Sequence, residues 1–245
     1  MFKKTLLAAV LVAASATAYA DLVTPTQTET FTGVAGNDST KEGVSPFVFD
    51  KFDESLGTLT GVFVQYSLDI ANGLIGADNL TNEEVEGTGD LGGDVILSSD
   101  LAMFRDGTFT SIFEKLELLQ STTFTLAADP TLSVGGIEGE DVQSFEGSDF
   151  SANSGLISLN SDFLSQFAGA GETFTVDFDS GSTTIVDVSG AQGFFQAVDM
   201  IVNMDVYYSY EEFAEPVESN DVPAPLGFAA LGLALAGLGA KRKKA

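Results

Sequence analysis

The sequence predicts an all-β protein, an antiparallel β-sandwich of jelly-roll-like or immunoglobulin-like type, followed by a short C-terminal transmembrane helix. Three observations lead to this prediction. Hydrophobic and polar residues alternate in several segments, which is the pattern of half-buried strands. Acidic, glycine-rich stretches separate these segments, and their residue types favour turns. Segments with helical periodicity are too few to supply the crossover helices that a parallel sheet requires.

The first 20 residues have the three zones of a secretory signal peptide, namely a positive start, an apolar run and a small-residue cleavage site. Ala18 and Ala20 provide the small residues that signal peptidase accepts, so we expect cleavage to leave Asp21 as the new N-terminus. An uncleaved N-terminal anchor is the alternative, although the apolar run is short for about 30 Å of hydrocarbon.

The first strand that the pattern defines clearly covers residues 61–70. Its inward face consists of Val62, Val64, Tyr66, Leu68 and Ile70. Acidic, glycine-rich stretches at 36–43, 76–94 and 135–148 are predicted to be loops. The stretch 76–94 is long enough to suggest a functional or mobile loop.

The middle of the chain contains shorter elements. Residues 122–126 predict a strand because they are rich in Thr and Phe. Residues 111–120 fit either a helix, by their apolar spacing, or a strand, by their flanking residues. Ser161 is suited to cap a helix over 162–168, which Gly169 would end.

Two further elements precede the C-terminal tail. Residues 174–178 and 183–188 alternate and predict a hairpin around the Asp-Ser-Gly turn between them. Residues 197–211 show the longest alternation in the chain, with Ile201 and Tyr207 as apolar exceptions on the polar face. The apolar face comprises Val198, Met200, Val202, Met204, Val206, Tyr208 and Tyr210.

The C-terminal tail combines a proline motif, an apolar span and a basic end. The motif is Val222-Pro223-Ala224-Pro225, and it should be stiff because proline fixes φ. Residues 226–240 carry no charge and, as a helix, cover about 22 Å. Residues 241–245 contain four basic side chains, which stay on the cytoplasmic side of a membrane. Both a transient stop and a plain anchor that is never cut fit this arrangement.

This tail resembles the PEP-CTERM sorting signal, with Ala224 where that signal usually has Glu. The resemblance implies that an exosortase, a membrane-embedded transpeptidase, recognises the tail and passes the protein to the cell surface or the extracellular matrix. It also implies a setting of exopolysaccharide production and biofilm.

Composition limits the functions of the exported part, which we divide into a domain at 21–212 and an acidic, proline-containing linker at 213–225. Between the signal peptide and the tail lie all 36 acidic residues and only four basic ones, a net charge of −32. Such a surface repels phosphate backbones, so we expect no nucleic-acid partner. The chain contains no Cys and no His, which excludes an ordinary structural zinc site and removes the commonest general base.

Two segments of the domain are similar to the choice-anchor E family. Residues 49–62 read Phe-Asp-Lys-Phe-Asp-Glu-Ser-Leu-Gly-Thr-Leu-Thr-Gly-Val, and residues 167–174 read Phe-Ala-Gly-Ala-Gly-Glu-Thr-Phe. The resemblance would span residues 31–210. It implies a bacterial surface protein with no established activity, and it supplies no catalytic residues. Independently of the family, Leu56-Gly57-Thr58 predicts a turn that leads into a strand.

The sequence lacks the Gly-x-Ser-x-Gly, Walker and dinucleotide motifs, and we expect no enzymatic activity and no catalytic residue. Calcium is the most plausible ligand, because oxygen-rich flexible loops suit it. The candidate ligands in the stretch 76–94 are Asp78, Asn79, Glu83, Glu84, Asp90 and Asp94. The alternative is an acidic surface that only keeps the protein soluble.

These observations predict an exported cell-envelope or extracellular-matrix protein with a structural or interaction role. Its expected partners are signal peptidase, an exosortase-like enzyme, the membrane through the tail, and an extracellular polysaccharide. A carbohydrate-binding module or a calcium-stabilised adhesin-like domain at the cell surface is the alternative, although sugar-binding platforms favour Trp and this chain has none.

Overall fold

The computed structural model describes residues 21–41, 43–129 and 141–213. Most of these residues form β-strands, with one short 3₁₀ helix in the described part, and the predicted antiparallel sandwich is confirmed. Backbone contacts divide the chain after Glu212, and the description that follows concerns the unit before that point.

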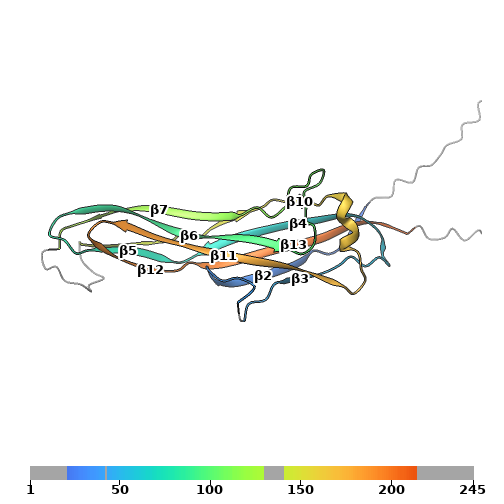
Figure 1. The fold of residues 1–245 in the computed structure, drawn as a ribbon, viewed down its shortest axis with the longest axis horizontal. Helices are drawn as coiled ribbons and strands as arrows, with labels where there is room; N and C mark the ends of the chain where they lie inside the picture. The colour runs from blue at the N-terminus through green and yellow to red at the C-terminus, as the bar shows by residue number, and fades with distance from the viewer. Residues whose placement is uncertain (1–20, 42, 130–140, 214–245) are drawn as a thin grey trace, which may run out of the picture. The chain divides into compact units, whose positions relative to one another are not determined.

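The first layer of the sandwich contains a six-stranded and a three-stranded sheet (Figure 1). The six-stranded sheet consists of β1 (Leu22–Val23), β2 (Gln27–Val34), β13 (Asp199–Glu212), β4 (Gly57–Ala71), β9 (Phe150–Asn153) and β10 (Ile157–Ser158). The three-stranded sheet consists of β12 (Ala191–Gln196), β5 (Leu74–Asn79) and β8 (Val142–Glu146). The register shows that β5 continues the line of β4, β12 that of β13, and β8 that of β9.

The second layer is a four-stranded sheet whose strands run without interruption. Its order is β3 (Phe47–Asp50), β11 (Thr173–Val188), β6 (Val85–Ser99) and β7 (Leu116–Leu126). In Figure 1, β6 and β11 pass from the region of β5 and β12 to the region of β4 and β13. When in-line strands are counted as one, the layers run β2–β13–β4–β9 and β3–β11–β6–β7.

The break in the first layer has a backbone cause at residues 72 and 73. Asn72 has a φ of 58° and Gly73 a φ of 82°, so the chain leaves extended geometry between β4 and β5. A Cβ on Gly73 would lie 2.7 Å from Cγ1 of Val198, which sits between β12 and β13. Gly147, between β8 and β9, donates its N–H to the carbonyl of Gly73 at 3.1 Å. The interruption therefore crosses the three neighbouring lines of strands at the same height.

The core lies between the layers and follows the predicted alternation. The even-numbered residues 62–70 of β4 and 200–208 of β13 are buried, as their strands' patterns predicted. They belong to one core with the aromatic side chains of the second layer. Phe31 of β2 and Phe178 of β11 meet across the core at a ring distance of 4.6 Å. Burial of this continuous apolar surface is the main source of stability, since the chain has no disulfide.

The prediction of a long loop over residues 76–94 is wrong. This stretch contains most of β5, a short connection, and most of β6. Its glycines are strand residues that allow close approach of neighbouring backbones; a Cβ on Gly92 would lie 2.1 Å from the carbonyl oxygen of Leu118. Glycine abundance therefore reflects tight strand packing here rather than turn formation.

The predicted hairpin over residues 174–188 is also wrong. β11 is one strand of 16 residues, and it pairs with β6 from Val176 to Val188. Ser180, in the expected turn, is buried and donates its hydroxyl to the carbonyl of Asn37. The ladder with β6 and this contact hold the Asp-Ser-Gly sequence extended.

Smaller differences concern three other segments. The helix is a 3₁₀ helix, η1 (Ser161–Phe167), and its cap is Asn160, whose side chain accepts the N–H of Asp162 at 3.0 Å. Of the segment 111–120, residues from Leu116 onward belong to β7, so the strand alternative is confirmed there. The predicted loop at 135–148 contains β8, and its residues 135–140 lie outside the described part.

The predicted ends of the chain lie outside the described residues. They are the signal peptide at 1–20, the span at 226–240, the basic tail at 241–245, and the linker at 213–225 apart from Phe213. Within the described residues, no helix has the length and apolar character needed to span a bilayer.

Candidate functional site

An open groove of about 750 Å³ lies on the outward face of the first layer, at its break. The register places side chains in rows across this face, and one row contains Thr32, Ile201, Asp69 and Ser151 from four neighbouring strands. These positions alternate with core residues along each strand, so their side chains point away from the core. The strand pairing of β2, β13, β4 and β9 therefore builds the walls.

Cross-strand hydrogen bonds hold polar side chains of this face in position. Thr30 donates its hydroxyl to Oδ1 of Asn203 at 2.8 Å. The amide of Asn203 reaches Oδ2 of Asp69 at 3.5 Å, and the amide of Asn72 donates to Oδ2 of Asp199 at 2.6 Å. These contacts orient the carboxylates of Asp69 and Asp199, and each carboxylate has a second oxygen that can accept from a ligand.

The lining of the groove contains both acidic and apolar side chains. Asp69, Asp149 and Asp199 line it, and the described lining residues include no Lys or Arg. Val34 is the cross-strand partner of Asp199 and Ile201 that of Asp69, and these two aliphatic residues are 45% and 38% exposed. The groove therefore offers hydrogen-bond acceptors and hydrophobic contact side by side.

An aromatic pair lies farther along the same outward face. Tyr207 of β13 and Phe63 of β4 are cross-strand partners, and their rings stack at 4.9 Å with an angle of 11°. Both side chains are half-buried. Ile201 and Tyr207 are six positions apart on β13, which corresponds to about 20 Å of strand.

The structure does not bring the predicted calcium ligands together. Asp78 and Asn79 are buried on β5, whereas Glu83 and Glu84 lie in the turn, and Asp90 and Asp94 lie on β6. Asp90 and Asp94 are four residues apart on one strand, about 13 Å. In the part of the chain that the structure describes, no group of three or more acidic residues could hold a metal ion.

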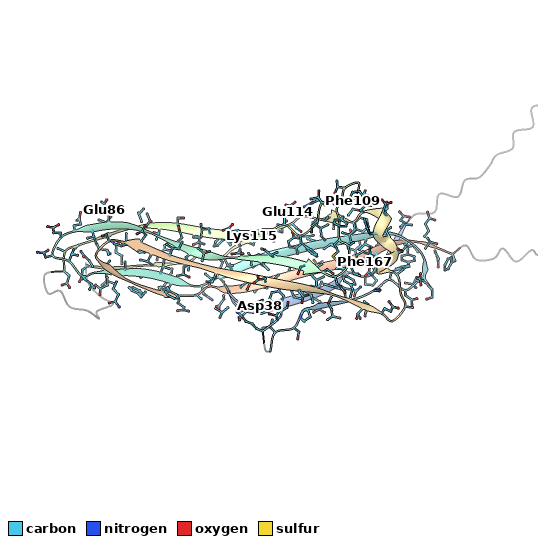
Figure 2. All side chains as sticks on the ribbon, viewed as in Figure 1. Asp38, Glu86, Phe109, Glu114, Lys115 and Phe167 are labelled. Carbon is cyan, nitrogen blue, oxygen red and sulfur yellow. The ribbon has the colours of Figure 1, made fainter. Side chains whose placement is uncertain are left out.

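The predicted ligands have structural contacts instead. The Asn79 amide donates to the carbonyls of Glu83 at 2.7 Å and Ala127 at 2.6 Å, so Asn79 organises the β5–β6 turn. Asp94 pairs with Lys115 at 3.5 Å. Figure 2 shows Lys115, the partner of Asp94, near the middle of the sandwich. Glu86, which also belongs to the stretch 76–94, lies near one end. The acids of this segment are thus spread over β5 in the first layer, the turn that follows it, and β6 in the second layer.

The segments 49–62 and 167–174, far apart in the sequence, meet in the fold. Phe52 donates its N–H to the carbonyl of Phe167 at 2.8 Å, and β3 pairs with β11 so that Phe49 opposes Phe174. The rings of Phe49 and Phe174 stack at 5.5 Å. Gly57 begins β4 after a turn, as predicted, and a Cβ there would lie 2.1 Å from the carbonyl oxygen of Glu211.

Two tyrosines with raised pKa values connect the two layers through hydrogen bonds of their hydroxyl groups. Burial raises the pKa of Tyr208, and the nearby charge of Asp50 adds to this effect. The Tyr208 hydroxyl donates to the backbone carbonyl of Asp50 at 2.7 Å. Burial is also the main cause of the raised pKa of Tyr66, whose hydroxyl bonds the backbone of Ile112 and Glu114. Both phenols therefore stay protonated and tie the layers together.

The sequence contained a signal for the groove that we did not use. Ile201 and Tyr207 were the two apolar exceptions on the polar face of the 197–211 strand. Ile201 lines the groove, and Tyr207 forms the aromatic pair with Phe63. Apolar residues on a solvent-facing side are the kind of exception that indicates a binding surface.

The predicted processing residues lie outside the described part of the chain. They are Ala18, Ala20, Val222, Pro223, Ala224 and Pro225.

Comparison with known proteins shows no family. No family model matches the chain, and no curated protein matches it. A structure of T=1 particles derived from infectious bursal virus aligns with 10% identity over 94% of this chain and 51% of its own, with a TM-score of 0.14. The structure of the infectious bursal disease virus Gt strain aligns with 10% identity over 85% and 47%, also with a TM-score of 0.14. The chain spans about half the length of these viral chains, and likenesses this weak support no conclusion about its fold or function.

Proposed function

We propose that this chain is an exported protein of the cell envelope or extracellular matrix, with a structural or interaction role and no catalytic one. In this proposal an exosortase-like transpeptidase recognises the C-terminal tail, and the choice-anchor-like unit at 21–212 is displayed outside the cell. The joining of the segments 49–62 and 167–174 in the fold supports a common role for the two motifs.

The observation that carries the proposal is where the folded unit begins and ends. Leu22 pairs with Tyr210, so the first and last strands of the unit lie side by side at one end of the sandwich. Tyr210 and Asp199, which lies in the groove, are eleven positions apart on β13, about 35 Å of strand. A unit held through its C-terminal end would thus present the groove well away from the point of attachment.

Three surface carboxyl groups are held in the ionised form. Hydrogen bonds from Thr40 lower the pKa of Asp38, those from Ser55 lower the pKa of Asp53, and Lys51 lowers the pKa of Glu172. A carboxyl group that acts as a general acid at neutral pH needs a raised pKa. These three are held ionised instead, in keeping with an acidic surface that favours solubility.

The topology favours the jelly-roll alternative over the immunoglobulin-like one. With in-line strands merged into eight, the order is 1-8-3-6 in one layer and 2-7-4-5 in the other. Eight strands in two layers connected in this way are typical of a jelly roll. Because one fold hosts many functions, this topology supports the architecture and not the activity.

Export and sorting can be tested on the full chain in its native host. We expect the extracellular protein to begin at Asp21 and to lack the Lys-rich end, which mass spectrometry of both termini would reveal. The double variant Pro223→Ala, Pro225→Ala should retain the basic end and accumulate in the membrane, because the stiff segment that the enzyme reads is gone.

A matched control is the double variant Pro25→Ala, Pro46→Ala, which removes two prolines from the folded unit and leaves the tail unchanged. It should be processed like the parent protein. An extracellular parent protein that keeps its Lys-rich end would contradict sorting, and a chain that stays in the cytoplasm with an intact leader would contradict export.

A further inference from the structure

We infer that the groove binds a neutral, hydroxyl-rich oligosaccharide, a segment of a linear polysaccharide. The inference rests on the proposed function in one respect, because an extracellular matrix is where such a polymer would meet this surface. The residues that line the groove on β2, β13, β4 and β9 support the inference independently of export and sorting.

The alternation of apolar and polar groups in the groove matches the two sides of a sugar. A pyranose ring has C–H faces that seek hydrophobic contact and hydroxyls that need hydrogen-bond partners. Val34 and Ile201 provide exposed aliphatic surface in the groove, and Asp69 and Asp199 stand beside them as oriented acceptors. Mostly apolar walls with a few fixed polar groups are the usual composition of a ligand site.

The negative charge of the groove favours a neutral sugar over an anionic one. Three carboxylates line the groove and its described lining residues include no basic side chain, so uronic-acid or sulfated polymers are repelled. A cationic polymer finds carboxylates over the whole acidic surface and gains no particular advantage here. In this groove, exposed aliphatic surface lies next to hydroxyl acceptors within one hollow, which favours a neutral sugar.

The outward face also suggests that the ligand is a chain rather than a single sugar. Two polar rows across the strands lie between the groove and the Phe63–Tyr207 pair, namely Thr30–Asn203–Ser67 and Thr28–Asp205–Gln65. The stacked pair offers a second apolar contact about 20 Å from Ile201. A linear oligosaccharide lying along β13 would reach both apolar contacts.

Calorimetric titration of the purified full-length chain in mild detergent tests the inference. The neutral probes are cellohexaose, mannohexaose and maltohexaose; hexagalacturonate and the hexamer of glucosamine are the charged probes. We expect saturable binding of at least one neutral probe at roughly millimolar concentration or below. The uronate should not bind, and raising the salt concentration should leave neutral-probe binding unchanged.

Matched variants locate the site. Val34→Thr with Ile201→Thr removes aliphatic surface from the groove, and we expect about tenfold weaker binding. Val48→Thr with Ile185→Thr is the control, because these residues are 45% and 49% exposed on the second layer. Asp69→Asn should also weaken binding about tenfold, since the amide loses a charged acceptor. All positions are solvent-facing, so the variants should fold, which thermal unfolding checks.

Absence of binding to all three neutral probes would overturn the inference, as would binding only to the glucosamine hexamer. Equal losses in the groove and control variants would also overturn it. These results come from purified protein and leave export and sorting untouched, so a failure here is distinct from a failure of the proposed function.

Discussion

The two layers of the sandwich differ in continuity. The second layer consists of long strands, and β6 and β11 pair over 13 consecutive residue pairs. The first layer is interrupted at Asn72 and Gly73 and at the same height in its neighbouring strands. The outward face of the continuous layer combines Thr, Asp and Glu with four exposed aliphatic side chains, and an open hollow of about 520 Å³ lies over β6 and β7. The interrupted layer has the groove of about 750 Å³.

This difference shows how a sandwich can make a site without a long loop. Extended strands side by side present a regular face, and the break in that geometry gives a more enclosed groove than the open hollow over β6 and β7. Here the departure takes few residues: the positive-φ pair Asn72 and Gly73 in one line lies beside short connections in the two neighbouring lines. The unbroken layer beneath keeps the two halves of the first layer on one core.

The largest effect should come from breaking the core that the continuous layer organises. Phe178 is almost fully buried and contacts the rings of Phe31 and Phe47. Phe178→Ala should lower the free energy of unfolding by about 3–5 kcal/mol, because it removes apolar contacts and leaves a cavity. Urea denaturation followed by fluorescence of the tyrosines measures this change. A loss below about 1 kcal/mol would mean that the layers do not share this core.

A substitution at the break tests the interrupted layer directly. Gly73→Ala should cost about 2–3 kcal/mol, because φ is positive and the new Cβ meets Val198. Gly107→Ala is the control: its φ is 68° and nothing lies within 4 Å of its added Cβ, so about 1 kcal/mol is expected. Equal losses in the two variants would show that the break does not depend on close contact with Val198.

A smaller loss of stability should follow from removing the hydroxyl of Tyr66, which connects the two layers by hydrogen bonds. The Tyr66 hydroxyl on β4 bonds the backbone of residues 112–114, just before β7, and it also accepts the N–H of Glu114 at 2.9 Å. Tyr66→Phe should cost about 1–2 kcal/mol, because it leaves backbone groups without this partner. Hydrogen exchange at Glu114 should become faster. Unchanged stability and exchange would indicate that other contacts hold this segment.

The smallest effect concerns pH and an exposed ion pair at the edge of the continuous layer. Lys51 lies 2.9 Å from Glu172 and holds its pKa below the usual 4.5. A lowered folded-state pKa gives stability that is present above the unfolded-state value and is lost as the pH falls through the folded-state value. The parent protein should therefore be slightly more stable than Glu172→Gln at pH 7 and equal to it well below pH 4.5. A difference that persists in acid would refute this electrostatic origin.

Sequence reasoning predicted the elements that periodicity defines. Alternation with a period of two correctly predicted the buried even-numbered residues 62–70 of β4 and 200–208 of β13. The pattern shifts at the next residue, where a register irregularity leaves Ser209 buried and Tyr210, predicted to face inward, half-buried. The hairpin predicted within β11 was wrong because Asp-Ser-Gly has turn chemistry, and only pairing with β6 holds it extended. The loop predicted at 76–94 was wrong because glycine also serves close strand packing.

The groove could not be predicted from the sequence, for a different reason. Thr32, Ile201 and Asp69 are separated by more than 130 residues at the extremes and share a row only through strand register. Register depends on the tertiary fold and not on local pattern. The local signal was the pair of apolar residues on the polar face, Ile201 and Tyr207. The alternation identified them as exceptions but could not show which residues of other strands lie beside them.

One measurement tests the central claim, that the interrupted layer is the binding layer. Amide chemical shifts of the labelled full-length chain are recorded during titration with the neutral hexasaccharide that binds best. The account predicts shifts around Thr32, Asp69, Ala71 and Ile201 in the first layer, and none at Ile185 or elsewhere on the outward face of the second. Shifts centred on the second layer, or none in the first, would contradict it.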